Sequence, residues 1–232
     1  MTMKPVQKLQ DALDELALQM KNALPTEVLE AFEKAIEQTR EAGLNKGVSV
    51  GTKAPDFTLT STDGKQITLS KELEKGPVVL VFYRGVWCPY CNLELRAYEQ
   101  IIDEIEAVNG GVIAISPQTA EYSSAIQEKH GLRFPVVSDV QNQTAKKYEL
   151  TSQMSEKLKQ IYQSIEISLD VFNGDGDHSW ELPLPATYVM DREGIIRFAS
   201  VDADYKKRVE PGEVLRLLKA LQRDTWARGN KS

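Results

Sequence analysis

Two cysteines, Cys88 and Cys91, are the residues of this chain whose spacing most clearly predicts chemistry. They lie where an apolar run over residues 77–83, typical of a buried strand, gives way to a helical pattern over residues 92–98. A cysteine in the first turn of a helix faces unpaired N–H groups and the positive end of the helix dipole, which favour the thiolate. Because only two residues separate the cysteines, a disulfide between them can form and break locally. The pattern indicates a redox dithiol in which Cys88 is the more exposed and the more acidic thiol.

Two other interpretations of the cysteine pair are weaker. A metal site needs further ligands, but the chain has no third cysteine and only two histidines, His130 and His178. Thiols that merely pack in the core are common, but the position between strand and helix, with Pro89 after the first cysteine, argues against that role. The sequence also carries no Gly-rich dinucleotide motif, phosphate-binding loop or serine-hydrolase elbow. We therefore expect neither a metal nor another cofactor.

Three separate segments of the chain together match the sequence pattern of one protein family. They are APDFTL at residues 54–59, FYRGVWCPYC at residues 82–91 and LPLPATYVMDREG at residues 182–194. Together they resemble the peroxiredoxin-like (AhpC/TSA) branch of the thioredoxin superfamily, and the resemblance covers about residues 48 to 222. It implies a thioredoxin fold, thiol redox chemistry and a peroxide as the oxidant.

The resemblance also implies roles for individual residues. Cys88 matches the cysteine that attacks the peroxide, and Cys91 matches the second cysteine of a thioredoxin-type pair, which would resolve the sulfenic acid. Pro185 matches the proline that precedes a Thr-bearing strand in thioredoxin-like folds, where it is usually cis and faces the dithiol. Together with Arg84 and Trp87, it makes up the expected substrate-binding set.

The chain departs from the family pattern around the dithiol. Typical peroxiredoxins have a proline six residues and a threonine three residues before the attacking cysteine, where this chain has Phe82 and Gly85. The arginine that they use from across the pocket falls near Pro185 and is absent there. Arg84 would supply the missing positive charge, unless it is a loop arginine that faces solvent. Trp87 would line the pocket, unless it only packs.

Residues 170–184 are predicted to form a flexible loop rich in Gly and Asp. The segment lacks the Gly and Glu spacing of a calcium-binding EF-hand loop. We expect the loop to approach the dithiol through Trp180 and Leu182. His178 would then donate a proton to the leaving alkoxide, although a lone loop histidine is more often a surface residue.

The composition is that of an ordinary globular protein, with 41% hydrophobic and 27% charged residues. A net charge of -6 without blocks of like charge argues against binding to nucleic acid or to an anionic membrane. No segment approaches the roughly 20 apolar residues that span a bilayer, and the first residues lack the apolar core of a signal peptide. We therefore expect a cytoplasmic protein whose thiols are mostly reduced between turnovers.

Residues 4–43 show two amphipathic helices with a break at Pro25. We divide the chain into an N-terminal helical extension, residues 1–47, and a thioredoxin-like domain, residues 48–232. A hairpin of about forty residues cannot bury two apolar stripes on itself. It is expected to pack on the main domain or on another subunit, and the second case would give a homodimer.

The remainder of the chain alternates strands with helices, which predicts an α/β domain with parallel crossovers. A late hairpin adds an antiparallel part, so we expect a mixed central sheet flanked by helices on both faces. The expected strands are 54–59, 66–69, 77–83, 111–116, 134–138, 186–191 and 195–199, and the expected helices are 70–76, 88–109, 119–130, 142–149, 152–165 and 211–226.

These observations predict a thiol-dependent antioxidant peroxidase that reduces hydrogen peroxide or organic hydroperoxides. Cys88 would become a sulfenic acid, Cys91 would resolve it, and a thioredoxin- or glutathione-type donor would restore both thiols. A protein dithiol–disulfide oxidoreductase is the alternative, favoured by the CPYC motif that glutaredoxins share and by the missing threonine. A non-enzymatic redox sensor, whose N-terminal hairpin binds or releases a partner on oxidation, is the third hypothesis.

Overall fold

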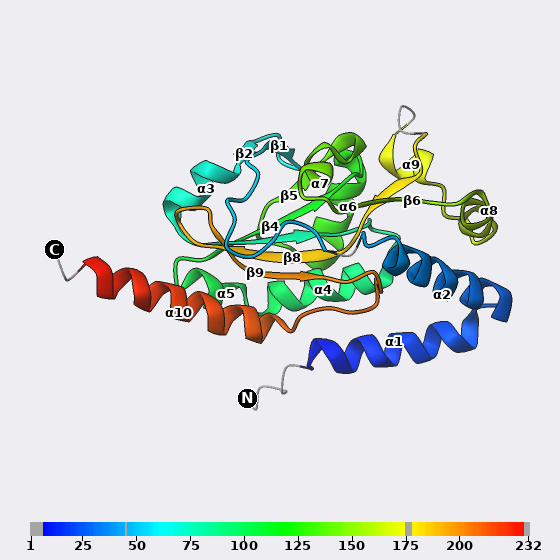
Figure 1. Ribbon diagram of the computed structural model, residues 1–232, viewed down its shortest axis with the longest axis horizontal. Coiled ribbons are helices and arrows are strands. Elements are labelled where there is room, and N and C mark those ends of the chain that lie inside the picture. Colours follow the sequence, from blue (N-terminus) through cyan, green and yellow to red (C-terminus); the bar gives the residue numbers. More distant parts are fainter. Residues whose placement is uncertain (1–6, 45, 175–177, 230–232) are drawn as a thin grey trace.

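The computed structural model describes residues 7–44, 46–174 and 178–229, the last six in backbone only. Its centre is a seven-stranded sheet with the order β2-β1-β5-β4-β3-β8-β9 (Figure 1). Strand β3 runs parallel to β4 and antiparallel to β8, so the sheet is mixed. The strands are β1 Thr58–Ser61, β2 Gln66–Thr68, β3 Val78–Phe82, β4 Gly111–Ser116, β5 Val136–Ser138, β6 Thr151–Gln153, β7 Glu181–Pro183, β8 Ala186–Met190 and β9 Ile196–Val201.

Helices cover both faces of the sheet. In Figure 1, α4, α5 and α10 lie below the sheet, and α3 and α7 lie above it. The helices are α1 Leu9–Ala23, α2 Thr26–Glu41, α3 Leu69–Lys75, α4 Pro89–Gln100, α5 Ile102–Glu106, α6 Ala120–His130, α7 Gln143–Lys147, α8 Glu156–Ser164, α9 Leu169–Asn173 and α10 Pro211–Gly229, with a short 3-10 turn at Val140–Asn142.

The central strand β3 shows why its sequence is continuously apolar. Side chains alternate across a strand, so Val79 and Val81 enter the core below the sheet, whereas Leu80 and Phe82 enter the core above it. A strand buried on both faces needs apolar residues at every position. The predicted α/β class, with a mixed sheet between two layers of helices, is confirmed.

Several predicted boundaries are wrong. The helix expected to run to about residue 109 breaks at Ile101, and α5 begins at the next residue. The expected helix over 152–165 starts instead with strand β6, which pairs with β7 in a separate two-stranded sheet. The expected loop over 170–184 contains α9 and β7, while its residues 175–177 lie outside the described part. Local patterns of three residues are too short to predict a strand whose stability comes from a distant partner.

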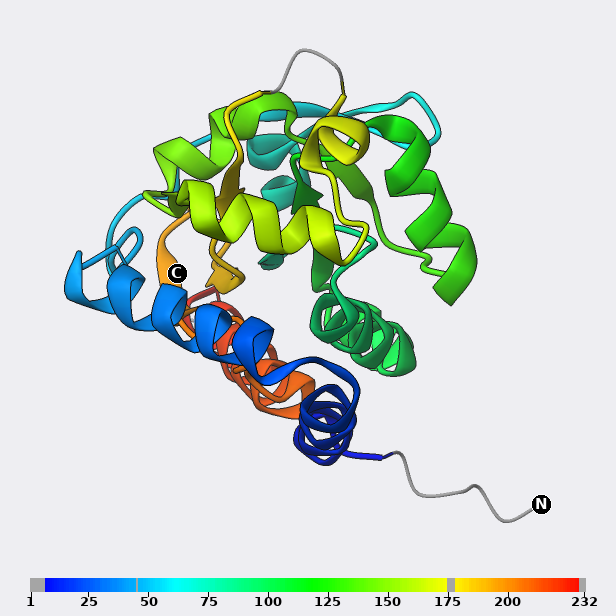
Figure 2. The same ribbon diagram turned by 90° about the vertical axis from the view of Figure 1, so that its right-hand side faces the viewer.

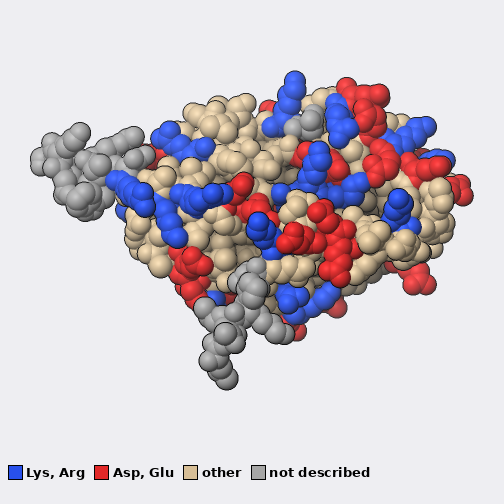
Figure 3. Space-filling view, turned by 90° about the horizontal axis from the view of Figure 1, so that it is seen from below, with Lys and Arg blue, Asp and Glu red and all other residues tan. Residues whose placement is uncertain are grey.

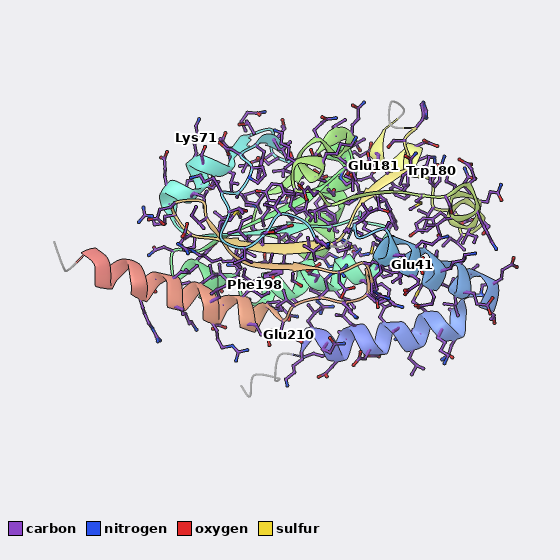
Figure 4. The ribbon with its side chains drawn as sticks, viewed as in Figure 1. Glu41, Lys71, Trp180, Glu181, Phe198 and Glu210 are labelled. Atoms are coloured by element: carbon purple, nitrogen blue, oxygen red, sulfur yellow. The ribbon has the colours of Figure 1, made fainter. Side chains whose placement is uncertain are left out.

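The N-terminal hairpin packs on its own chain, one of the two expected arrangements. Leu9 and Leu13 of α1 belong to the same core cluster as residues of α4. Glu210, which is labelled in Figure 4, lies just before α10. Its carboxylate accepts hydrogen bonds from the backbone N–H groups of Leu9 and Gln10 at the start of α1. A carboxylate there offsets the unpaired donors and the positive end of the helix dipole. Figure 2 shows α2 lying beside α8, the helix that it contacts.

The lower face of the molecule is mixed in charge. Figure 3 shows Lys and Arg interspersed with Asp and Glu over the face seen from below in Figure 1. No helix within the described ranges is long and apolar enough to cross a bilayer.

Replacing Leu13 tests whether the α1 contact stabilises the fold. Leu13 is 2% exposed, so Leu13→Ala should lower the free energy of unfolding by about 2–5 kcal/mol in urea denaturation. Leu18→Ala is the matched control, because Leu18 is 61% exposed on the same helix and its loss should cost less than about 0.5 kcal/mol. Equal effects of the two substitutions would contradict the docking of α1.

Candidate active site

The two cysteines meet at the start of α4. Cys88 is the residue before the helix, Pro89 occupies its first position, and Cys91 lies in its first turn. The Cys91 thiol donates a hydrogen bond to the Cys88 sulfur, with 3.0 Å between the two Sγ atoms, and both cysteines are free. Pro89 suits this position, because the backbone N–H of the first helical residue has no acceptor within the helix, so the N–H that proline lacks is not missed there. The sulfurs are close enough to form a disulfide with little movement of the backbone.

Arg84 contacts the first cysteine. One terminal nitrogen of its guanidinium lies 3.5 Å from Cys88 Sγ, and the other donates to the hydroxyl of Tyr162 at 3.0 Å. The guanidinium carbon lies 3.9 Å from the ring centroid of Tyr205 and 5.0 Å from that of Trp87. Arg84 is only 9% exposed, so the alternative of a solvent-facing loop arginine is wrong.

A second arginine contacts the other cysteine. Arg208 Nη2 lies 3.5 Å from Cys91 Sγ, and Arg208 Nε lies 2.5 Å from the carboxylate of Glu94. Glu94 also accepts a hydrogen bond from the Thr187 hydroxyl at 3.2 Å. The side chains of Arg208 and Glu94 are 3% and 0% exposed, so each charge is buried and paired.

Sequence reasoning missed this second arginine and its partners. One signal was available, since Glu94 lies on the core-facing side of α4 between Cys91 and Leu95. A carboxylate on a buried helix face requires a cation or several donors. No sequence pattern identifies Arg208 as that cation, because 114 positions separate it from Glu94.

The two arginines set the acidity of the dithiol. Burial acts to raise the pKa of Cys88, but the hydrogen bond from Cys91 and the charges of Arg84 and Arg208 bring it well below its ordinary value. Burial raises the pKa of Cys91, and the neighbouring Cys88 sulfur raises it further. These shifts favour a thiolate at Cys88 and a protonated thiol at Cys91, the order of acidity that the sequence predicts.

The predicted exposure of Cys88 is wrong, because both cysteines are 0% exposed. Cys88 belongs to a core cluster that includes Tyr90 and residues of α1, with Trp87 and Tyr205 packed against it. The N-terminal helix and the aromatic rings thus cover the end of α4, where a helix start would otherwise be open to solvent. A cavity of about 250 Å³ has Arg84 in its wall, and Trp87 and Pro89 line a separate cavity beside α1.

Gly85 stands where typical peroxiredoxins have threonine, and the structure explains the absence of a side chain. A Cβ atom at this position would lie 2.4 Å from Trp87 Nε1 and 3.1 Å from the side chain of Gln118. The backbone has a φ of +156°, which side chains disfavour. Trp87 therefore occupies the space in which the missing hydroxyl would lie.

Pro185 lies in the wall of the same cavity as Arg84. The expectation of a cis bond is wrong, since the peptide bond before Pro185 is trans. Trans is the more stable state of such a bond, and the two-residue link between β7 and β8 accommodates it.

The remaining sequence candidates take other places. His178 is exposed and its Nδ1 lies 3.2 Å from Asp170, with no contact to the dithiol among the described residues. Trp180 is buried in a small cluster that also contains Tyr162, the residue that binds Arg84, and Leu182 lines the cavity. The described residues contain no group of three or more Cys, His, Asp or Glu that could hold a metal ion.

Asn92 is a further residue that the sequence did not identify. Its amide nitrogen donates to the carbonyl oxygens of Val86 and Cys88, each at 2.8 Å, and its oxygen lies 2.7 Å from His130 Nε2. These bonds fix the backbone of the loop that carries Cys88, because they satisfy two carbonyls at the turn into α4.

Comparison with known proteins places this chain in a family. The profile of the AhpC/TSA family matches residues 50–199. The chain belongs to the AhpC/TSA family. It is thus peroxiredoxin-like and a member of the thioredoxin superfamily, as the sequence predicted, and the thiol peroxidase class expected from the sequence is confirmed.

Individual relatives agree with this assignment. The chain is 29% identical to the chloroplastic peroxiredoxin Q of Triticum aestivum, over 75% of this chain and 68% of the relative. It is 26% identical to the chloroplastic peroxiredoxin Q of Sedum lineare, over 83% of this chain and 89% of the relative. The crystal structure of peroxidoxin BcpB from Mycobacterium tuberculosis has a similar fold, with a TM-score of 0.58 and 20% identity, covering 75% of this chain and 97% of that one. The thioredoxin-like fold is therefore confirmed.

Removing the Arg84 charge tests its effect on Cys88. Arg84→Met should raise the pKa of Cys88, because an adjacent cation stabilises the thiolate but not the thiol. The measurement is the ultraviolet absorbance of the thiolate as a function of pH. Arg133→Met is the control, since Arg133 is half-exposed, pairs with Glu99 and Asp103 and should leave the titration unchanged. An unchanged pKa in Arg84→Met would show that the guanidinium has no such effect.

Proposed function

We propose that this protein reduces hydroperoxides with Cys88 as the attacking thiolate and Cys91 as the resolving thiol. The observation that carries the proposal is the arrangement of three groups. The Cys88 sulfur lies 3.0 Å from the Cys91 sulfur and 3.5 Å from the buried guanidinium of Arg84. A thiolate next to a cation is the nucleophile that peroxide reduction needs.

In the first step, the Cys88 thiolate attacks one peroxide oxygen and the O–O bond breaks. Cys88 becomes a sulfenic acid, and the departing alkoxide or hydroxide takes a proton from solvent. Two buried donors, Arg84 Nε and Trp87 Nε1, have no hydrogen-bond partner among the described residues. They would hold the peroxide oxygens in place of the threonine hydroxyl that Gly85 lacks. Pro185 would complete the wall on the substrate side.

In the second step, Cys91 attacks the sulfenic sulfur, and a disulfide and a water molecule form. Cys91 must lose its proton for this attack, and the Arg208 guanidinium beside it would stabilise the thiolate that results. A thioredoxin- or glutathione-type dithiol or thiol would then reduce the disulfide. A reducing compartment such as the cytoplasm would supply that donor.

Protein dithiol–disulfide exchange is the second candidate function. The short distance between the sulfurs and the glycine at position 85 favour it. The complete burial of Cys88 argues against it, because a protein disulfide needs more room around the sulfur than a peroxide does. Reduction of insulin faster than reduction of hydrogen peroxide would decide for this candidate.

Serine substitutions separate the roles of the two cysteines. Cys88→Ser should lower kcat/KM for hydrogen peroxide at least about 1,000-fold, because the nucleophile itself is removed. Cys91→Ser should retain a single fast turnover but lose steady-state turnover with a thioredoxin-type donor. Mass spectrometry after dimedone labelling should locate a sulfenic acid at Cys88 in this variant.

Other results of the same experiments would contradict the roles assigned to Cys88 and Cys91. Peroxide consumption by Cys88→Ser at the wild-type rate would exclude Cys88 as the nucleophile. Oxidation at Cys91 rather than Cys88 in the wild-type protein would reverse the assigned roles. Slow turnover with a change in sedimentation on oxidation would favour a redox sensor instead.

A further inference from the structure

A cavity of about 250 Å³ lies between the N-terminal hairpin and the segment that carries β6, α8 and β7. Helix α2 contributes Phe32, Ala35 and Ile36, one face of the helix at spacings of three and four residues. The opposite side is formed by Met154, Leu158 and Leu182. In Figure 2, α2 and α8 run beside each other on this side of the molecule.

The wall of this cavity is polar at its rim and mostly apolar in its buried part. Exposed polar residues, Gln38, Gln153 and Ser155, contribute to its rim. The buried part is apolar except for the group around Arg84, which is the one charged side chain among the described residues of the wall. A cavity lined in this way favours an apolar ligand with one polar end.

Arg84 connects the cavity with the dithiol. It lies in the cavity wall beside Tyr162 and Tyr205, and its guanidinium reaches the Cys88 sulfur at 3.5 Å. Its Nε donor is buried and has no partner within the described part of the chain. A buried donor without a partner is unfavourable, so an oxygen atom of a ligand would be favoured there.

We propose that this cavity binds the alkyl chain of a medium-length organic hydroperoxide and directs its peroxide group past Arg84 to Cys88. The inference rests on the proposed function and adds to it the subsite that selects the length of the alkyl chain. At about 30 Å³ for each water-sized group, 250 Å³ accommodates roughly eight methylene groups. Breakage of the O–O bond leaves the corresponding alcohol in the cavity and the oxygen on Cys88.

One wall of the cavity comes from a helix outside the family domain, so the selectivity for the alkyl chain would be a feature of this chain. Helix α2 lies outside residues 50–199, the part that matches the family profile. The chemistry at Cys88 would therefore belong to the family, whereas the choice of substrate would come from the added hairpin.

The test compares 1-octyl hydroperoxide with ethyl hydroperoxide, two substrates with the same reacting group. Each buried methylene is worth roughly a fourfold gain in binding, so the wild-type kcat/KM should be at least about tenfold higher for the octyl compound. Ala35→Phe fills the cavity from α2 and should reduce this ratio to near one. Ala12→Phe is the matched control, because Ala12 on α1 lines a different cavity and should leave the ratio unchanged.

A second measurement uses the unaltered protein. The product, 1-octanol, should compete with hydroperoxide in the wild type at concentrations where ethanol has no effect. A ratio near one in the wild type, no inhibition by 1-octanol, or a ratio that responds to Ala12→Phe but not to Ala35→Phe would overturn the inference. If the wild type still reduces ethyl hydroperoxide and hydrogen peroxide in such a case, the proposed function stands. A wild type that reduces neither of these nor 1-octyl hydroperoxide would contradict the proposed function itself.

Discussion

A buried thiolate is possible in this protein because two arginines lie against the dithiol. Removing a charge from water costs several kcal/mol unless other charges or hydrogen bonds replace the solvent. Here Arg84 reaches Cys88, and Arg208 reaches Cys91 from a position 117 residues further along the chain. The Glu94 carboxylate pairs with Arg208, so the site contains two cations and two anions. This balance favours the charged form of the Cys88 sulfur inside a closed core.

The residues around the arginines also compensate for the loss of water around a buried charge. Arg84 lies over the ring of Tyr205 and donates to Tyr162, and these contacts hold a desolvated guanidinium in one position. The Trp87 ring fills the space beside Gly85, which removes the hydroxyl expected from the family but adds a buried N–H donor. In the proposed function, this donor takes the place of the missing hydroxyl in binding a peroxide oxygen.

The N-terminal hairpin links stability with access to the dithiol. Helix α1 closes the core over α4, and Glu210 fixes its first turn. Helix α2 forms one side of the cavity that leads to Arg84. The hairpin therefore covers the sulfurs with α1 and lines an apolar cavity with α2, and in the proposed function that cavity would admit the peroxide.

The sequence by itself determined the sheet class, the position of the dithiol and its order of acidity. These features depend on local rules: alternation along β3, the helix start at Pro89 and the two-residue spacing of the cysteines. It also gave the two helices of the N-terminal hairpin, because their apolar stripes are periodic. Only the tertiary structure decided which cation serves Cys91, that Cys88 is covered, and that β6 pairs with β7. Each of those depends on residues far apart in the chain, whose approach is set by packing and by the cost of burying a charge, and no local pattern encodes that.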